Sequence, residues 1–168
     1  MVGATQRSLA HLEMREHYGH DDPAYLRWRE GQRGDAVLPA EAEKWHELVR
    51  ESVARGVTWR RLRVVPEPLT DYLRWEHHIT TAVNVEAGEE VRWLPRRRAS
   101  GLLLPGNDLW LFDRRTVKFH HLSPDPEGEG LIDHGDELTN DPAVVAQTIA
   151  AFDAAWEHGI LHGEFQPD

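Results

Sequence analysis

Segments with helical spacing and segments with strand-like alternation follow one another along this chain of 168 residues. Residues 39–56 carry an apolar stripe at helical spacing, and residues 57–65 then alternate as a strand does. The same order returns with a helix over 70–88 and a strand over 91–94. Strands interleaved with helices are typical of an α/β domain, in which helices cover the faces of a sheet. We therefore expect an α/β fold with a mixed sheet of about four or five strands, flanked by helices.

Shorter signals predict the remaining elements. Helices are expected over residues 5–18, 23–31 and 142–159, the last two because an Asp-Pro pair opens each of them. Further strands are expected over residues 102–104, 109–112 and 116–121. Residues 123–135 hold two prolines and three glycines and are predicted to form a loop or a mobile flap. Within the strand over 57–65, the alternation changes phase at Arg60 and Arg61, which predicts a β-bulge.

These elements divide the chain into an N-terminal helical segment, residues 1–38, and an α/β domain, residues 39–168. The chain has no cysteine, which excludes disulfides, thiolate zinc sites and cysteine nucleophiles. No run approaches the ~20 apolar residues of a membrane helix, and the N-terminus lacks the layout of a signal peptide. We expect a cytoplasmic protein with no membrane partner and no cofactor.

The net charge of −10 is concentrated at one end of the chain. Residues 1–118 hold 19 basic and 18 acidic residues, whereas the last 50 residues hold eleven acids and no Lys or Arg. We expect this acidic region to lie over at least one cluster of basic residues, because opposite charges attract. The expected contacts join residues 55–63 or 92–98 to at least one of six acids: Asp125, Glu127, Glu129, Asp133, Asp136 and Glu137.

Seventeen of the 19 basic residues are arginines, and most of them gather in three clusters, at residues 55–63, 92–98 and 114–118. Arg61 and Arg63 share one face of a predicted strand, and Arg92 lies on the next strand. If these strands are neighbours, three guanidinium groups would converge on a phosphate or a carboxylate. The candidate ligand-binding residues are Arg61, Arg63, Arg92, Arg96, Arg97 and Arg98.

The alternative is that these arginines are neutralised within the protein. Acids of residues 125–141, or Glu67, Glu89 and Glu90, would then pair with the guanidinium groups, as is common for arginines on sheets. In that case little positive charge would be left for an external anion.

Acid–base catalysis would need an imidazole and a carboxylate in contact. Asp113 follows one strand of the predicted hairpin and His120 lies on the other, so these two residues form the candidate catalytic pair. The eleven histidines include no His-Glu-x-x-His motif and no spacing that fixes three ligands around zinc. We therefore expect no metal site.

Several runs of sequence resemble a family of actinobacterial domains of unknown function. They are HLEMR from His11, RGV from Arg55, AGE from Ala87, VRWLPR from Val91, LPGND from Leu104 and WLFD from Trp110. The resemblance covers nearly the whole chain and implies a bacterial cytosolic setting. Members tend to be encoded near helix-turn-helix regulators, which implies a part in signalling with a regulator as protein partner.

The predicted order of strand, helix, strand, strand pair and helix is also similar to one half of a phospholipase D-like domain. That superfamily needs a His-x-Lys motif with a downstream acid, whereas this sequence offers the reverse order, Lys118-Phe119-His120. His followed two residues later by Lys occurs nowhere in the chain. This likeness predicts a fold and supplies no catalytic residue.

The clustered arginines favour a non-catalytic regulatory or partner-binding module that senses a small anionic ligand. Two alternatives stay open. A phosphodiesterase-like or transferase enzyme would hold a phosphate with its arginines and move protons with His120 and Asp113. A nucleic-acid-binding protein would use residues 60–63 and 96–98, although the negative net charge opposes such binding.

Overall fold

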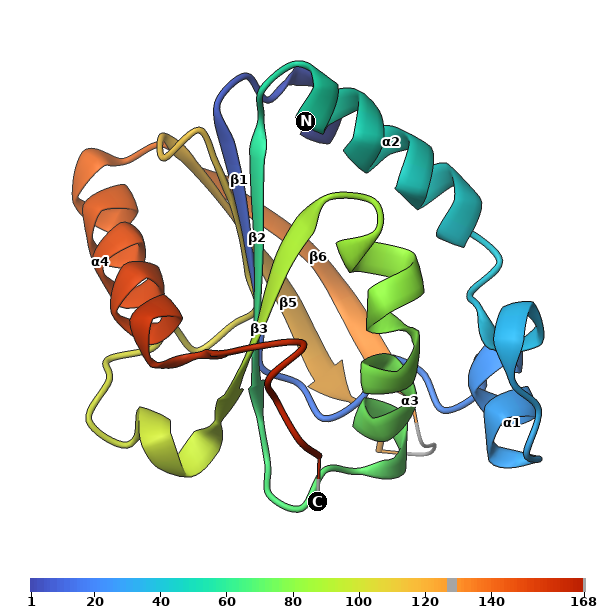
Figure 1. Cartoon of the computed structure of the whole chain (residues 1–168). Coiled ribbons are helices and arrows are strands. Elements are labelled where there is room, and N and C mark those ends of the chain that lie inside the picture. The colour runs from blue at the N-terminus through green and yellow to red at the C-terminus, as the bar shows by residue number, and fades with distance from the viewer. Residues whose placement is uncertain (127–129, 168) are drawn as a thin grey trace.

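A seven-stranded mixed sheet runs through the centre of the computed structural model, which describes residues 1–126 and 130–167 (Figure 1). Its strands lie in the order β6-β5-β4-β1-β2-β3-β7. Their bounds are β1 (Ser8–Glu13), β2 (Thr58–Val65), β3 (Glu89–Pro95), β4 (Leu109–Phe112), β5 (Thr116–Pro124), β6 (Leu131–Thr139) and β7 (Ile160–Leu161). β1, β2 and β3 are parallel neighbours, and the other pairs are antiparallel. The expected α/β class with a mixed sheet is confirmed.

Helices cover both faces of the sheet (Figure 1). On one face lie α1 (Pro23–Arg29), α2 (Ala42–Ala54) and α3 (Asp71–Thr80), and on the other lies α4 (Pro142–His158). α3 continues into a π-helical turn, η3 (Thr81–Val85), and short 3-10 turns form η1 (Val2–Ala4), η2 (Gly34–Val37) and η4 (Arg96–Ala99). Side-chain oxygens of Asp22, Thr70 and Asp141 cap α1, α3 and α4. We call the two sides of the sheet the α2–α3 face and the α4 face.

The two faces differ in chemistry because successive strand residues point to opposite sides. On the α4 face, Leu62 packs with Trp156 in an apolar core. On the α2–α3 face, Trp59 packs in a second apolar cluster, but Arg61 and Arg63 follow it at the same alternation and are buried as well. The α4 face is therefore apolar, whereas the opposite face mixes aromatic and charged side chains.

The helix predicted over residues 5–18 is wrong, because Ser8–Glu13 forms β1 near the middle of the sheet. Four of its six residues are buried, on both faces of the sheet. The strand therefore lacks the apolar–polar alternation of a strand with one wet face. β1 also brings part of the expected N-terminal segment, residues 1–38, into one sheet with strands of residues 39–168.

The sheet also has more strands than the four or five expected. The outer strand β6 is exposed along seven of its nine residues, so its sequence has the polar character of a loop. Because β5 reaches Pro124 and β6 begins at Leu131, the loop predicted over 123–135 is wrong at both ends, and residues 127–129 lie outside the described part. The strand predicted over 102–104 is also wrong, since those described residues belong to no strand.

The bulge predicted at Arg60 and Arg61 is wrong as well. β2 pairs residue by residue with β1 and with β3 across this region, without a shift of register. The phase of the sequence changes because Arg61 and Arg63 occupy buried positions where apolar residues are usual. Within the described ranges, no helix is both long and apolar enough to cross a membrane.

The end of α4 generates a stability prediction. A Cβ added at Gly159 would lie 2.9 Å from Leu62 Cδ1 and 3.0 Å from Arg92 Cβ. We expect Gly159→Ala to lower the free energy of unfolding by about 1–3 kcal/mol through overpacking, measured by urea denaturation. Gly163→Ala is the control, since no heavy atom lies within 4 Å of its added Cβ. Equal unfolding midpoints for the two variants would contradict the close approach.

Candidate functional site

A cluster of buried charges lies on the α2–α3 face of the sheet, and we call it the sheet-face cluster. Its six members come from β1, β2, α3 and β3: His11, Glu13, Arg61, Arg63, Glu76 and Glu89. The strand registers place His11 beside Arg61 and Glu13 beside Arg63, so parallel pairing of β1 with β2 assembles its centre.

Arg61 joins the three parallel strands through its guanidinium group. Its Nε donates a hydrogen bond of 2.8 Å to Glu89 Oε2 on β3. Its Nη1 donates to Glu13 on β1 and, at 2.8 Å, to Nδ1 of His11. Burial alone would lower the pKa of Arg61, but Glu13 and Glu89 outweigh this effect and raise it. Arg61 is therefore a charged group held at both ends by carboxylates.

Arg63 continues the cluster toward α3. Its Nε donates a hydrogen bond of 2.6 Å to Glu13 Oε2, and its Nη1 donates one of 2.7 Å to Thr80 Oγ1. Burial opposes ionisation of Glu13, but the charges of Arg61 and Arg63 hold the pKa of Glu13 far below its ordinary value. The Nη2 of Arg63 lies 3.5 Å from Glu76 Oε1, a longer contact than its others.

Glu76 is the least satisfied member of the cluster. Burial, only partly offset by Arg63 and reinforced by the charge of Glu13, raises the pKa of Glu76 to about 7. Its Oε2 is buried and has no hydrogen-bond partner among the described residues. Glu76 therefore exchanges its proton near neutral pH, whereas burial lowers the pKa of His11 well below its ordinary value and leaves that ring neutral.

A cavity of about 300 Å³ opens beside the cluster. It is lined by Pro39, Glu41, Ala42, Trp45, Arg61, Arg63, Ile79, Val83, Asn84 and Trp110. The guanidinium carbon of Arg61 lies 5.5 Å from the ring centre of Trp45 and 5.7 Å from that of Trp110, within cation–π range. The cavity thus presents aromatic rings and guanidinium groups together, and it reaches the lower end of the volume range of small-molecule sites.

Glu89 forms hydrogen bonds with three of the side chains that line this cavity. Its Oε1 accepts hydrogen bonds of 2.6 Å from Trp45 Nε1 and 2.8 Å from Asn84 Nδ2. One carboxylate thereby positions an indole from α2, an amide from η3 and, through its second oxygen, Arg61 from β2. Hydrogen bonds of this kind restrict the rotamers of the side chains that line the cavity.

Of the predicted ligand-binding residues, the structure brings Arg61 and Arg63 together at the cavity and separates Arg92 from them. β3 does neighbour β2, but Arg92 lies opposite Leu62 in the register and points to the α4 face. There its Nη1 donates a hydrogen bond of 3.0 Å to the carbonyl of Trp156, and its Nη2 lies 3.0 Å from Glu90 Oε1. The expected convergence of three guanidinium groups is wrong, because Arg92 has the opposite side-chain phase.

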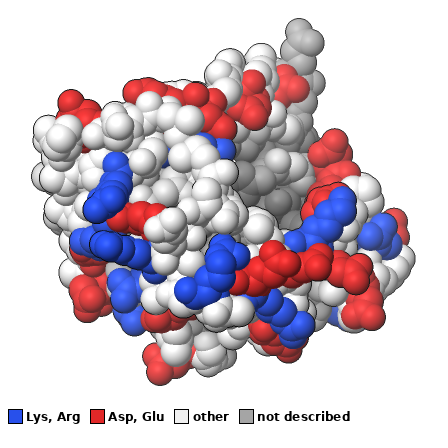
Figure 2. All heavy atoms as spheres, turned by 90° about the horizontal axis from the view of Figure 1, so that it is seen from above, with Lys and Arg blue, Asp and Glu red and all other residues white. Residues whose placement is uncertain are grey.

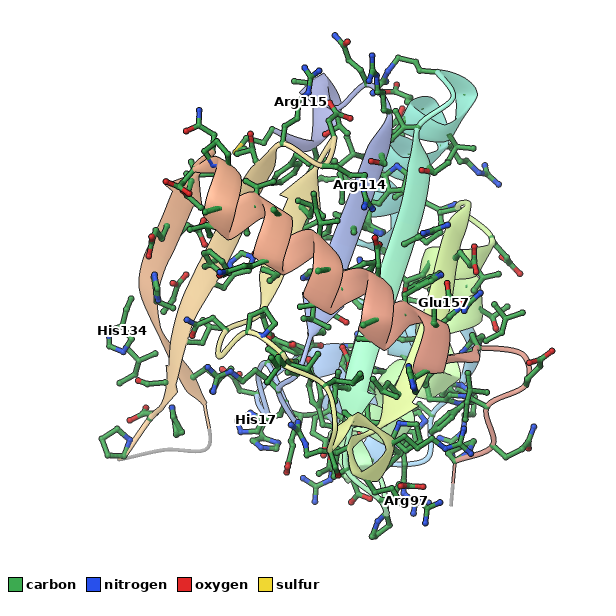
Figure 3. The ribbon with its side chains drawn as sticks, turned by 90° about the vertical axis from the view of Figure 1, so that its left-hand side faces the viewer. His17, Arg97, Arg114, Arg115, His134 and Glu157 are labelled. Atoms are coloured by element: carbon green, nitrogen blue, oxygen red, sulfur yellow. The ribbon has the colours of Figure 1, made fainter. Side chains whose placement is uncertain are left out.

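Arg96, Arg97 and Arg98 lie on η4, away from the cavity lining. Arg96 Nη2 donates a hydrogen bond of 2.8 Å to the carbonyl of Met14, and Arg97 Nε lies 2.8 Å from Glu67 Oε2. Figure 3 places Arg97 at one end of the molecule and Arg114 and Arg115 toward the other. Arg97 is thus far from Arg114 and Arg115, whereas the guanidinium carbons of Arg60 and Arg92 lie 5.1 and 4.5 Å from the ring centre of Trp156. On the face seen in Figure 2, basic and acidic side chains lie interspersed.

The predicted catalytic pair is also separated. Asp113 lies at the turn between β4 and β5, where its carboxylate accepts hydrogen bonds from the backbone of Gln6, Arg7 and Ser8 at 2.7–3.2 Å. His120 lies at the other end of this hairpin, where its N–H bonds to the carbonyl of Asp108 and its Nδ1 lies 2.6 Å from Asp136. The expected contact is wrong because the strands between the two residues hold them apart.

Two acids of the acidic region pair with bases other than those expected. Asp136 lies 2.7 Å from Lys118, and Asp153 lies 2.8 Å from Arg114, so these acids meet the basic cluster at residues 114–118. Glu127 and Glu129 lie outside the described residues. The buried arginines pair instead with acids of β1, α3 and β3, as the alternative interpretation expected for Glu89. Glu67 and Glu90 also pair as that alternative expected, with Arg97 and Arg92.

The sequence did not single out Glu13, Trp45, Asn84 or Trp110 as residues of the site. One signal was available, since Arg61 and Arg63 follow Trp59 on the same face of β2. In the part of the chain that the structure describes, no group of three His, Cys, Asp or Glu side chains has the arrangement of a metal site.

Two solved structures have a similar fold, and one of them is a phospholipase D family member, which is the likeness that the order of elements predicted. NucT from Helicobacter pylori is similar to this chain with a TM-score of 0.51 and 10% identity, covering 95% of this chain and 85% of NucT. A phospholipase D family member, Nuc from Salmonella typhimurium, gives a TM-score of 0.48 and 11% identity, covering 95% of this chain and 84% of Nuc. At these identities the likeness is one of fold.

The chain belongs to the family described as Domain of unknown function (DUF6879), whose pattern matches residues 1–167. No curated protein has a matching sequence. The predicted membership of a family of domains of unknown function is confirmed.

The buried ion pairs of the sheet-face cluster are expected to contribute much more to the free energy of unfolding than an exposed ion pair does. Arg61→Leu would leave Glu13 and Glu89 buried beside fewer positive charges, so we expect the free energy of unfolding to fall by about 3–5 kcal/mol. Arg114→Leu, which removes the exposed pair with Asp153, is the control, with an expected loss of at most about 1 kcal/mol. Urea denaturation at neutral pH measures both, and similar losses would contradict the structural role of the cluster.

Glu76 predicts a pH dependence of stability. The unfolded carboxyl ionises near its ordinary value of 4.5, whereas burial raises its pKa in the folded protein to about 7. Between these values the folded state keeps a proton that the unfolded chain has lost, so stability contributed by this group falls as the pH rises. Glu76→Gln carries no such proton, and its stability relative to the unsubstituted protein should rise from about pH 5 to about pH 7. A difference in unfolding free energy that is constant over this range would refute the raised pKa.

Proposed function

We propose that this domain is a non-catalytic regulatory module that binds a small planar ligand in the cavity beside the sheet-face cluster. The observation that carries the proposal is the joint lining of this cavity by two buried guanidinium groups and two indoles, from Arg61, Arg63, Trp45 and Trp110. Indole faces stack on flat rings, and guanidinium N–H groups donate to oxygen or nitrogen acceptors. A ring compound with one or two acceptors matches both features.

The charge of the cluster restricts the ligand further. The positive charges of Arg61 and Arg63 are matched by the carboxylates of Glu13 and Glu89, which lie within ion-pair distance of them. Glu76 adds negative charge as it ionises near pH 7. Because no positive charge is left in surplus, the site favours a neutral or singly charged ligand over a phosphate ester. The small anionic ligand expected from the clustered arginines is therefore replaced by a neutral ring compound or a monoanion.

Several features support ligand binding without catalysis. Among the described residues that line the cavity, the titratable side chains are two arginines and Glu41, with no hydroxyl, imidazole or amine. Asp113 and His120, which an enzyme would use as acid and base, lie at opposite ends of a hairpin. Geometry of this kind favours the regulatory module over the phosphodiesterase-like or transferase alternative, and the burial of Arg61 and Arg63 in ion pairs favours it over nucleic-acid binding.

Fragment binding followed by proton–nitrogen correlation spectra tests this proposal. Benzamide, benzoate, benzamidine and inorganic phosphate, each at millimolar concentration, are the probes. We expect benzamide and benzoate to shift the indole N–H signal of Trp45 and the side-chain amide signals of Asn84, and phosphate to leave both unchanged. Trp45→Phe and Asn84→Asp variants assign these signals.

A cavity-filling variant and a neighbour provide the controls. Val83→Trp places an indole in the cavity and should abolish the shifts, whereas Val85→Trp, at a 40% exposed residue outside the lining, should keep them. If no probe shifts the two signals, or if Val83→Trp responds as the unsubstituted protein does, the cavity is not a binding site and the proposed function is wrong.

A further inference from the structure

The sheet-face cluster holds more carboxyl groups than guanidinium groups. Its charged members are the guanidinium groups of Arg61 and Arg63 and the carboxyl groups of Glu13, Glu76 and Glu89. The remaining member is a histidine that its burial keeps neutral. The cluster is therefore neutral when one carboxyl group carries a proton, and it has a single negative charge when all the carboxyl groups are ionised.

The contacts within the cluster show which carboxyl group takes this proton. Glu13 accepts hydrogen bonds from both arginines, and Glu89 accepts them from Arg61, an indole and an amide. Glu76 has only the contact of 3.5 Å between its Oε1 and Nη2 of Arg63, and its buried Oε2 has no hydrogen-bond partner among the described residues. A carboxylate with so few donors is the least stabilised anion of the three, so the proton resides on Glu76.

The side chains around Glu76 act on its charge in opposite directions. Burial has the largest effect and raises the pKa of Glu76 to about 7. Two arginines favour the anion and two acids oppose it, and these groups are Arg61 and Arg63 on β2, Glu13 on β1 and Asp108 just before β4. Two nearby phenols, those of Tyr18 and Tyr72, stay protonated because burial raises their pKa. Small changes in charge beside the cluster therefore decide whether Glu76 is ionised.

Arg63 connects Glu76 to the cavity. Arg63 lines the cavity, whereas Glu76 lies behind it and is not a lining residue. Nε and Nη1 of Arg63 make hydrogen bonds of 2.6 and 2.7 Å, but its Nη2 has the contact of 3.5 Å with Glu76. Nη2 of Arg61 likewise makes a long hydrogen bond, of 3.4 Å, to Glu89. These two terminal nitrogens have the longest contacts in the cluster, and a planar carboxylate accepts hydrogen bonds from donors of this kind.

We propose that Glu76 selects the charge of the ligand, so that an aromatic carboxylate binds together with one proton on Glu76, whereas an uncharged ring binds with Glu76 in either form. The inference rests on the proposed function, since it concerns the ligand of the same cavity. Ionised Glu76 competes for Arg63 and repels a second carboxylate. When Glu76 takes a proton from water, the carboxylate of the ligand replaces the charge that Glu76 has lost. Glu76 is thus a positioning residue that acts through Arg63.

The affinities of benzoate and benzamide between pH 6 and pH 8 test this inference. The two probes share a ring and differ in charge, and benzoate stays ionised over this range. About nine-tenths of Glu76 is protonated at pH 6 and about one-tenth at pH 8. We therefore expect the dissociation constant of benzoate to rise about ten-fold, and that of benzamide to stay constant. The shifts of the Trp45 and Asn84 side-chain signals, recorded at constant ionic strength, give both constants.

Two variants separate Glu76 from other titrating groups. Glu76→Gln keeps the size of the side chain but cannot ionise, so it should bind benzoate equally at pH 6 and pH 8. His78→Gln, at an exposed histidine of the same helix, is the matched control and should keep the ten-fold change. This control is needed because histidines also lose positive charge as the pH rises, which weakens the binding of anions.

A second measurement needs no variant. At pH 7, benzoate should take up about half a proton from the buffer as it binds, whereas benzamide should take up none. Calorimetry in two buffers with different enthalpies of ionisation measures this uptake.

The outcomes distinguish this inference from the proposed function. If benzamide binds but the affinity for benzoate is the same at pH 6 and pH 8, or if the two probes take up equal numbers of protons, Glu76 does not select the charge and the proposed function stands. A ten-fold change that persists in Glu76→Gln would also overturn the inference, since another group would then cause it. If neither probe binds at pH 6, the proposed function is wrong and the inference falls with it.

Discussion

The placement of Arg61 between Glu13 and Glu89 is the interaction on which the rest of the structure depends. Each of the three parallel strands at the centre of the sheet contributes one partner, so the contact exists only when all three are in register. A shift of one residue would turn these charges toward the apolar α4 face. The ion pairs therefore specify the register, although their desolvation offsets much of the Coulombic gain.

Because the buried charges occupy one face, the two faces of the sheet are packed differently. The α4 face has a continuous apolar core, and mostly apolar residues line a hollow between α4 and residues 101–105 on this face. On the α2–α3 face, the cluster takes space that apolar side chains would otherwise fill, and a cavity lined by Arg61 and Trp45 remains beside it. Asp108, which lies just before β4, accepts hydrogen bonds from the hydroxyl of Tyr18 and from the backbone N–H of Met14, just after β1. These hydrogen bonds connect the end of β1 to the start of β4.

The wrong predictions for β1 and β2 share one physical cause. The sequence pattern predicts a helix at β1 and a bulge in β2 because Glu13, Arg61 and Arg63 are charged residues at buried positions, with the half-buried His11 beside them. A prediction from hydrophobic periodicity treats every polar residue as exposed, so the prediction fails wherever buried charges neutralise each other. β6 failed for the opposite reason, since an outer strand that is exposed on both faces has no apolar stripe to detect.

The sequence by itself determined the α/β class, the positions of α1, α2, α3 and α4, and the strands β2 to β5, because their apolar patterns and caps are local. It also indicated that Arg61 and Arg63 share a face. Tertiary structure alone decided that Arg92 points away from them, that Asp113 and His120 stand apart, and that a cavity opens where it does. These outcomes depend on strand order, register and long-range ion pairing, which bring together residues as far apart in the chain as Glu13 and Glu89.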